Sequence, residues 1–261
     1  MPSVERNGVR LFFEEARGGG APIVLIHGWC CDHDFLAPQF EHFAKKGRRV
    51  VGLDLSGHGA SDKPHENYTM QRFADDVAFV CEHLGLAKVV PIGHSMGGIV
   101  AFDLASRYPE LVSALIMLDA AIVLPPEALA VVPRLVAELS GPDYQRVIRE
   151  FVTKTLSLPT DDPERRQKIL SAMASAPQHV AVSAYRALGE YDAAKTARVT
   201  APSLYIRADE PSPRSDMDRV RELLPGLAFG QTVGSGHFCQ LEVPDQVNAM
   251  IDRFLAIGTS E

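Results

Sequence analysis

The length, composition and charge of the chain restrict its function before any motif is considered. With 261 residues, of which 46% are hydrophobic, the chain can bury a substantial core in one large domain or in a domain that carries an insertion. Its formal net charge of -7 argues against nucleic acid or an anionic membrane as a partner.

The amino-terminal residues and the cysteines indicate a cytoplasmic protein. Residues 1–10 contain no apolar run followed by a cleavage site, and no segment approaches the roughly 18 apolar residues of a membrane span. The four cysteines show no CxxC spacing, so we expect free thiols rather than a zinc site or a disulfide framework. We therefore predict a cytoplasmic location, with no metal and no cofactor.

Short apolar runs alternate with amphipathic stretches, which is typical of an α/β fold with a mostly parallel sheet flanked by helices. Residues 9–13 alternate in polarity and predict an edge strand. Continuous apolar runs predict strands covered on both faces at residues 23–26, 50–53, 89–92 and 115–118. Helical spacing predicts helices at residues 69–84 and 96–108. Near the end of the chain we expect strands at 204–206 and 228–233, then a helix at 243–255.

One long region interrupts this alternation. From about residue 122 to residue 194 the composition is helical, prolines punctuate the sequence, and no convincing strand is found. We interpret this region as a helical cap inserted between two strands of the core. The predicted organisation is a first core part over residues 1–121, the cap over 122–194 and a second core part over 195–261.

The strongest chemical signal is the segment GHSMGG at residues 93–98, which matches G-x-S-x-G. It lies between a predicted strand and a predicted helix, where this motif forms a tight turn that holds the serine in a strained conformation. The turn places Ser95 at the amino terminus of the helix, where amide hydrogens favour developing negative charge. We therefore predict that Ser95 is a nucleophile.

A serine hydroxyl is a poor nucleophile at neutral pH, so Ser95 needs a base. Of the nine histidines, His237 follows the last predicted strand, in the glycine-rich segment GSGHF, and comes after Ser95 in the chain. A histidine placed there can accept the serine proton and return it to the leaving group. The sequence therefore predicts a Ser95–His237 pair.

The segment HGW at residues 27–29 follows a predicted strand and predicts an oxyanion hole. The backbone amides of Trp29 and Met96 can converge on an oxyanion from this loop and from the serine turn. We expect His27 to brace the loop. We also place His27, Cys31 and Phe238 at the substrate, because they flank the oxyanion loop and the predicted base.

Together these motifs resemble the α/β-hydrolase superfamily over essentially the whole chain. The resemblance rests on the segments HGW, DLSGHGASD at residues 54–62, GHSMGG and GHF at residues 236–238. It implies the α/β-hydrolase fold and a Ser-His mechanism, but it says little about the substrate.

The resemblance leaves the acid of the catalytic triad open. The family usually carries this acid in a G-x-x-D motif shortly after the penultimate strand. Counted forward from Pro202 that position falls on Pro211, whereas counted backward from the LPG segment it falls on Asp209. Some members place the acid after the preceding strand, where this sequence has Asp119. We favour Asp119, with Asp209 as the alternative and Glu210 as a further candidate.

Two enzymatic functions are compatible with these residues, and both predict a small-molecule substrate. A non-enzymatic receptor built on the same scaffold is a third interpretation, against which the intact Ser95, His237 and acid argue. The leading prediction is hydrolysis of a small carboxylic ester or lactone through an acyl-enzyme on Ser95, as in carboxylesterases and lactonases. The alternative rests on residues 27–33, HGWCCDH, which look like the corresponding loop of cofactor-independent dioxygenases that cleave 3-hydroxy-4-quinolone rings. In that case His237 deprotonates the N-heteroaromatic substrate, and Ser95 helps without being essential. The oligomeric state stays open.

Overall fold

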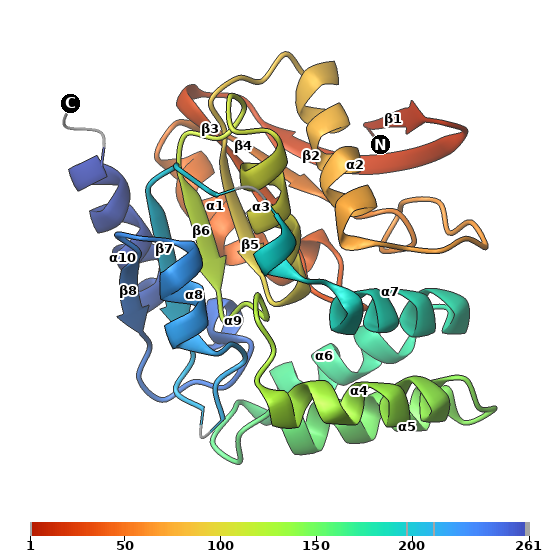
Figure 1. Ribbon diagram of the computed structural model, residues 1–261. Helices are drawn as coiled ribbons and strands as arrows, with labels where there is room; N and C mark the ends of the chain where they lie inside the picture. Colours follow the sequence, from red (N-terminus) through yellow and green to blue (C-terminus); the bar gives the residue numbers. More distant parts are fainter. Residues whose placement is uncertain (1, 197, 211, 259–261) are drawn as a thin grey trace.

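A computed structural model of the protein describes residues 2–196, 198–210 and 212–258. Its strands form one sheet in the order β1-β2-β4-β3-β5-β6-β7-β8 (Figure 1). The strands are β1 (Ser3–Arg6), β2 (Val9–Ala16), β3 (Gly19–Ile26), β4 (Arg48–Leu53), β5 (Val90–His94), β6 (Leu115–Leu118), β7 (Ser203–Arg207) and β8 (Ala228–Gln231). β2 is antiparallel to both β1 and β4, and all other neighbours are parallel.

The register of the parallel strands brings their carboxyl ends to one edge of the sheet. Ile26 of β3 pairs with Gly93 of β5, and His94 of β5 pairs with Leu118 of β6. Leu118 pairs in turn with Ile206 of β7. The segments that follow these four strands therefore emerge side by side, where an open α/β sheet places its ligand site.

Helices cover both faces of the sheet. One face packs against α1 (Ala37–Lys45), α9 (Cys239–Glu242) and α10 (Pro244–Gly258), and the other against α2 (Met70–His83), α3 (Met96–Arg107) and α8 (Met217–Leu223). Because the central strands are buried on both sides, their sequences read as continuous apolar runs rather than alternating ones.

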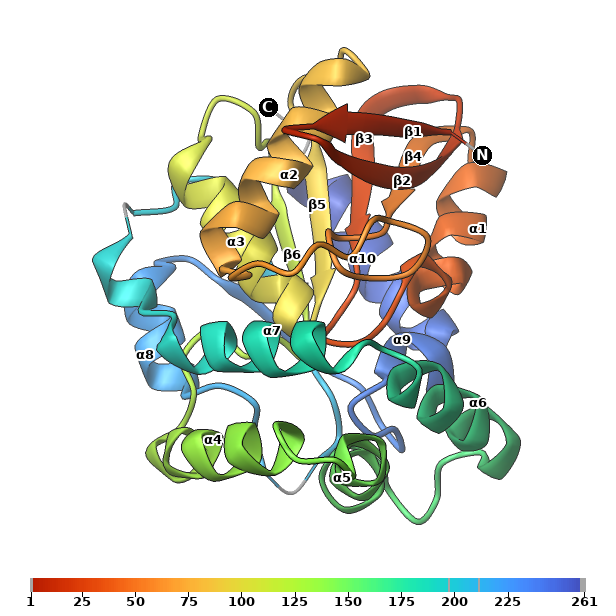
Figure 2. The same ribbon diagram turned by 90° about the vertical axis from the view of Figure 1, so that its right-hand side faces the viewer.

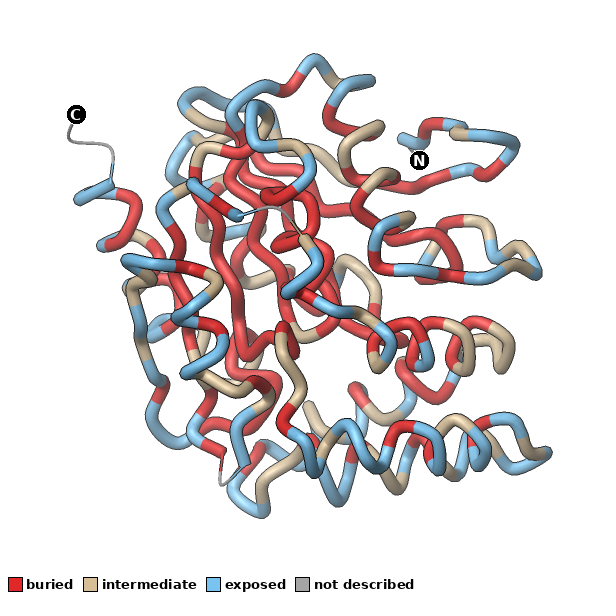
Figure 3. The backbone as a smooth tube through the Cα atoms, viewed as in Figure 1, coloured by how far each residue is buried: buried red, intermediate tan, exposed pale blue. Residues whose placement is uncertain are grey.

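In the described part of the chain between β6 and β7 lie four further α-helices, which are called the insertion helices below. They are α4 (Pro126–Leu139), α5 (Tyr144–Phe151), α6 (Pro163–Ala174) and α7 (Gln178–Glu190). Figures 1 and 2 place them beyond the carboxyl ends of the strands. Much of α4 and α5 faces solvent, whereas the central strands of the sheet are buried (Figure 3). They fall within the predicted cap, whose boundaries at residues 122 and 194 stay a prediction.

Short helical turns complete the chain. η1 (His33–Leu36) precedes α1, η2 (Val152–Leu156) extends α5, and η3 (Ala193–Lys195) follows α7. Among the described residues, no helix is long and apolar enough to cross a bilayer. All four cysteines are buried and free of disulfides.

The expected α/β fold is present, but the structure differs from the sequence-based prediction at the two ends of the sheet. Residues 9–13 form a strand as predicted, but the prediction that this strand lies at the edge is wrong, because β1 lies outside β2. β1 has four residues of which only Val4 is buried, so it carries no apolar run. The last strand ends at Gln231, two residues before its predicted end, because the chain turns away toward His237.

Candidate active site

Ser95 stands on the turn that joins β5 to α3. Its backbone has φ 55° and ψ -120°, a strained conformation that typically costs about 1–3 kcal/mol. Glycines make the turn possible: a Cβ on Gly93 would lie 2.1 Å from the carbonyl oxygen of Gly97, and one on Gly97 would lie 2.2 Å from that of Ile26. The turn leaves the Ser95 side chain half-buried at the amino terminus of α3.

His237 lies in the loop after β8, where its side chain contacts that of Asp119. The His237 Nδ1 and the Asp119 Oδ2 are 2.7 Å apart, and both side chains are almost completely buried. When Nδ1 donates to the carboxylate, Nε2 remains as the proton acceptor of the ring. This is the arrangement that a general base requires.

The carboxylate of Asp119 is held from two sides. Its Oδ1 accepts a hydrogen bond of 3.0 Å from the amide of Ala208, and its own amide donates to the carbonyl of Ile206 at 2.7 Å. Asp119 takes a left-handed conformation with φ 42° directly after β6. The strand end and the neighbouring β7 therefore fix the carboxylate beneath the imidazole.

Two further charged groups lie against this pair. Arg214 Nε is 3.7 Å from Asp119 Oδ2, and the Arg214 guanidinium also pairs with Glu210. Glu210 Oε1 lies 3.9 Å from His237 Nδ1, so a second carboxylate stands near the histidine. Arg214 is anchored by a hydrogen bond of 2.5 Å to the carbonyl of Thr155, on the turn after α5.

Burial and charge set the protonation states in this cluster. Burial lowers the pKa of His237, and Arg214 lowers it further, against the opposing effect of Asp119. Burial alone would raise the pKa of Asp119, but the hydrogen bond from His237 and the charge of Arg214 hold it below its usual value. Burial raises the pKa of Glu210 to about 8. The arrangement therefore favours a neutral imidazole beside an ionised Asp119.

Asp209 lies apart from the imidazole. Its Oδ2 accepts from the amide of Gly234 at 3.0 Å and its Oδ1 contacts Gln231 Nε2 at 3.4 Å. It braces the loop that leads to His237 and is exposed to solvent. The other position reached by counting, Pro211, lies outside the described residues. The geometry therefore favours Asp119 as the orienting acid.

Ser95 and His237 line one cavity of about 260 Å³ between the sheet and the insertion helices. Trp29, Cys31 and Phe238 line it as well. Among the described residues, no backbone acceptor is found for the amides of Trp29 and Met96, the two predicted oxyanion donors. The Cys31 thiol lies 3.4 Å from the carbonyl of Trp29, and burial raises its pKa, so we expect an unreactive thiol.

The sequence analysis placed His27 at the substrate. Of the residues that the structure describes, those that line the cavity do not include His27. Its ring is fully buried and both nitrogens face backbone: Nε2 lies 3.1 Å from the amide of Leu55 and Nδ1 lies 2.8 Å from the carbonyl of Gly28. Burial lowers its pKa, so the ring is neutral. This geometry fits the bracing of the oxyanion loop.

Sequence reasoning missed several residues that shape the site. His94, the residue before Ser95 in the segment GHSMGG, lines the cavity, and its Nε2 lies 2.9 Å from the carbonyl of His237. Arg214 also lines the cavity, but it comes from a loop without a motif. Trp29 donates from Nε1 to the carbonyl of Ala181 on α7 at 2.9 Å, which ties the oxyanion loop to an insertion helix.

The donor atoms of Asp119, Glu210 and His237 are close enough together to suggest a metal site. Positive charge is already supplied there by Arg214, which pairs with both carboxylates. A divalent cation would also compete with the hydrogen bond between His237 and Asp119. The donor set therefore fits a proton-transfer site better than a metal centre.

Residues 21–244 match the profile of the alpha/beta hydrolase fold, and this range contains Ser95, Asp119 and His237. The chain belongs to the α/β hydrolase fold family. Among its relatives, this α/β hydrolase is 31% identical to the AB hydrolase superfamily protein YisY of Bacillus subtilis (strain 168), over 94% of this chain and 95% of the relative.

Two solved structures are similar to this α/β hydrolase over nearly its whole length. A thermophilic esterase from Thermogutta terrifontis, with malate bound, is 28% identical and has a TM-score of 0.85, covering 99% of this chain and 97% of the esterase. Est816, described as an N-acyl homoserine lactone degrading enzyme, is 26% identical with a TM-score of 0.79. That alignment covers 97% of this chain and 100% of Est816.

Proposed function

We propose that this α/β hydrolase is a serine hydrolase that cleaves a small carboxylic ester or lactone through an acyl-enzyme on Ser95. The observation that carries the proposal is the hydrogen bond of 2.7 Å between His237 and Asp119 at the cavity that Ser95 also lines. The similar structures agree with this chemistry, since one is an esterase and the other degrades an acylated lactone.

In the proposed mechanism, the Ser95 Oγ attacks the carbonyl carbon while His237 Nε2 takes its proton. Asp119 stabilises the resulting imidazolium from the Nδ1 side. The amides of Trp29 and Met96 donate to the oxyanion. Collapse of this intermediate expels the alcohol, which takes its proton from His237, and water then attacks the acyl-enzyme by the same steps in reverse.

The region between β6 and β7 supplies walls of this site, and we propose that residues 122–194 act as a cap domain. Leu124, Val131, Phe151 and Leu156 line the cavity from this region. Apolar walls around a few polar groups are typical of sites for small ligands. A cavity of about 260 Å³ fits a small acyl group, so short esters are the first substrates to try.

The test compares the wild type with Ser95→Ala on p-nitrophenyl acetate, p-nitrophenyl butyrate and an N-acyl homoserine lactone. Loss of the nucleophile is expected to lower kcat at least about a thousandfold. Ser212→Ala is the matched control: Ser212 lines the same cavity but lies outside the turn between β5 and α3, so we expect this variant to keep wild-type turnover.

Turnover that is indifferent to Ser95 would contradict the acyl-enzyme mechanism. Oxygen uptake with a 3-hydroxy-4-quinolone would then be measured. If that uptake is abolished by His237→Ala but survives Ser95→Ala, the ring-cleaving alternative describes the protein instead.

A further inference from the structure

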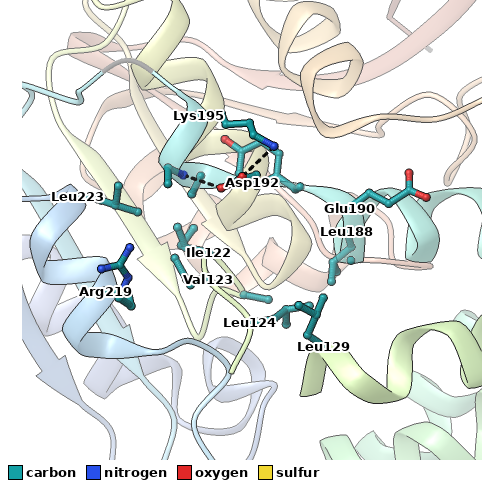
Figure 4. A pocket seen from close by; sticks show the side chains of 15 residues that line it. Ile122, Val123, Leu124, Leu129, Leu188, Glu190, Asp192, Lys195, Arg219 and Leu223 are labelled. Carbon is teal, nitrogen blue, oxygen red and sulfur yellow. Dashed lines mark hydrogen bonds and ion pairs between the residues drawn. The ribbon is translucent and has the colours of Figure 1, made fainter. Parts of the chain in front are cut away.

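A second cavity, of about 360 Å³, adjoins the site (Figure 4). It lies where the chain passes from β6 to α4 and from α7 back toward the core, with Arg219 and Leu223 of α8 on its other side. Three residues line both this side cavity and the cavity of Ser95: Ala121, Leu124 and Leu188. These three residues form the partition between the two spaces.

The partition is made of side chains on closely packed elements. Leu188 belongs to α7 and is 7% exposed, whereas Ala121 and Leu124 lie between β6 and α4. Next to Leu188, a Cβ on Gly189 would lie only 2.5 Å from Val132 Cγ1 of α4, so α4 and α7 approach closely there. Because helices packed this closely do not readily move apart, the two leucine side chains are the barrier between the cavities.

The side cavity offers apolar surface together with a charged rim. Ile122, Val123 and Leu223 contribute apolar side chains beside the partition (Figure 4). On the rim, Lys195 pairs with Asp192 at 3.1 Å, and the Arg219 guanidinium pairs with Glu222 outside the cavity. These charged side chains are largely solvent-exposed and already partnered. The space therefore fits an alkyl chain that ends near water better than a buried ion.

We propose that Leu124 and Leu188 limit the length of the aliphatic chain that the site accepts, and that the side cavity takes the end of a longer chain once this partition is shortened. The inference rests on the proposed ester or lactone hydrolysis at Ser95. The wild type is then expected to prefer short-chain esters. Leu124 and Leu188, which do not take part in the chemical steps, determine the substrate length.

The experiment measures kcat/KM for p-nitrophenyl esters from acetate to decanoate, and for alkyl acetates of matching length, because the chain can lie on either side of the ester bond. Leu188→Ala and Leu124→Ala each shorten the partition. Each methylene moved from water into an apolar site favours binding about fourfold. We therefore expect the ratio of kcat/KM for an eight-carbon chain to that for the shortest ester to rise at least about tenfold in one series.

Leu139→Ala is the matched control, because Leu139 is a fully buried leucine of α4 that lines neither cavity. Leu139→Ala should keep the wild-type preference for chain length. If its ratio of kcat/KM values shifts as much as that of the partition variants, the effect comes from loosened helices, and the proposed role of the partition is contradicted. Unchanged preference in both partition variants, with Ser95-dependent activity intact, overturns the partition alone. Absence of Ser95-dependent turnover with every ester contradicts the proposed function and the partition with it.

Discussion

Arg214 places a positive charge beside the pair of Asp119 and His237, whose imidazole must itself become positively charged during catalysis. Its Nε lies 3.7 Å from Asp119, and its charge acts to lower the pKa of His237. Glu210, which pairs with Arg214, stands 3.9 Å from His237 Nδ1. The guanidinium therefore favours the neutral base before reaction and opposes the imidazolium that forms during it.

Arg214→Met is expected to move the acidic limb of the pH profile. Activity should fall as His237 becomes protonated, and loss of the cation raises the pKa of His237, so the fall should begin at a higher pH. The measurement is kcat/KM against pH for a neutral ester. Arg219→Met, which removes an exposed cation paired with Glu222, should leave the limb in place. An unmoved limb in Arg214→Met would contradict this electrostatic role.

The two aspartates that the sequence left open should separate cleanly on substitution. Asp119→Asn removes the charge that orients and stabilises the His237 imidazolium, so kcat should fall on the order of a thousandfold to ten-thousandfold. Asp209→Asn keeps an oxygen that can accept from Gly234, so its kcat should stay close to the wild-type value. A larger loss in Asp209→Asn than in Asp119→Asn would reverse the assignment of the acid.

At the scale of the elements, the turn between β5 and α3 depends on close contacts between backbones. Gly97 faces the carbonyl oxygen of Ile26 at the end of β3, so α3 can approach the sheet only without a side chain there. The same contact places the amino terminus of α3 beside the oxyanion loop that continues from β3. The glycine thus links packing to the geometry of the nucleophile.

Gly97→Ala is expected to lower the free energy of unfolding by about 1–3 kcal/mol or more, because the new Cβ meets backbone that cannot move aside. Gly19→Ala is the control, since no atom lies within 4 Å of a Cβ built there. Urea denaturation of both variants measures the difference. Equal stability of the two variants would show that the turn tolerates a side chain.

The sequence predicted the elements whose burial requires a recognisable run or spacing of apolar residues. It did not predict elements that are only partly buried. The buried strands β5 and β6 read as apolar runs, and the segment GHSMGG marks the turn at Ser95. β1 and the short α8 bury few residues, so they carry no comparable signal. The sequence favoured Asp119 but left Asp209 and Glu210 open, because the contact of Asp119 with His237 spans 118 positions and depends on the order of β6 and β7.

At the scale of the whole molecule, the insertion helices are joined to the residues around the site by polar contacts. The buried carboxylate of Asp161 accepts from the amides of Leu158 at 2.7 Å and of Gly236 at 3.3 Å. Gly236 directly precedes His237. Arg165 of α6 pairs with Glu242 of α9 at 2.6 Å. The region between β6 and β7 therefore supports the loop that holds the predicted base.

Asp161→Ala should loosen this support. It leaves two amides without their acceptor, which costs about 1–3 kcal/mol each where the group stays buried, and it frees the backbone before His237. We expect a lower free energy of unfolding together with a lower kcat. Asp161→Asn, which keeps one acceptor oxygen, should lose less of both. If Asp161→Ala is less stable but keeps the wild-type kcat, Asp161 supports the fold only, and its predicted role in positioning His237 is contradicted.

The most direct measurement is the intact mass of the protein after rapid mixing with p-nitrophenyl acetate and acid quench, followed by mapping of the modified peptide. The proposed mechanism predicts an acetyl group on Ser95 in the wild type and its accumulation in His237→Ala if deacylation slows more than acylation. No adduct should form at this position in Ser95→Ala. Turnover at the wild-type rate in Ser95→Ala, or an acyl group carried only on another residue, would contradict it.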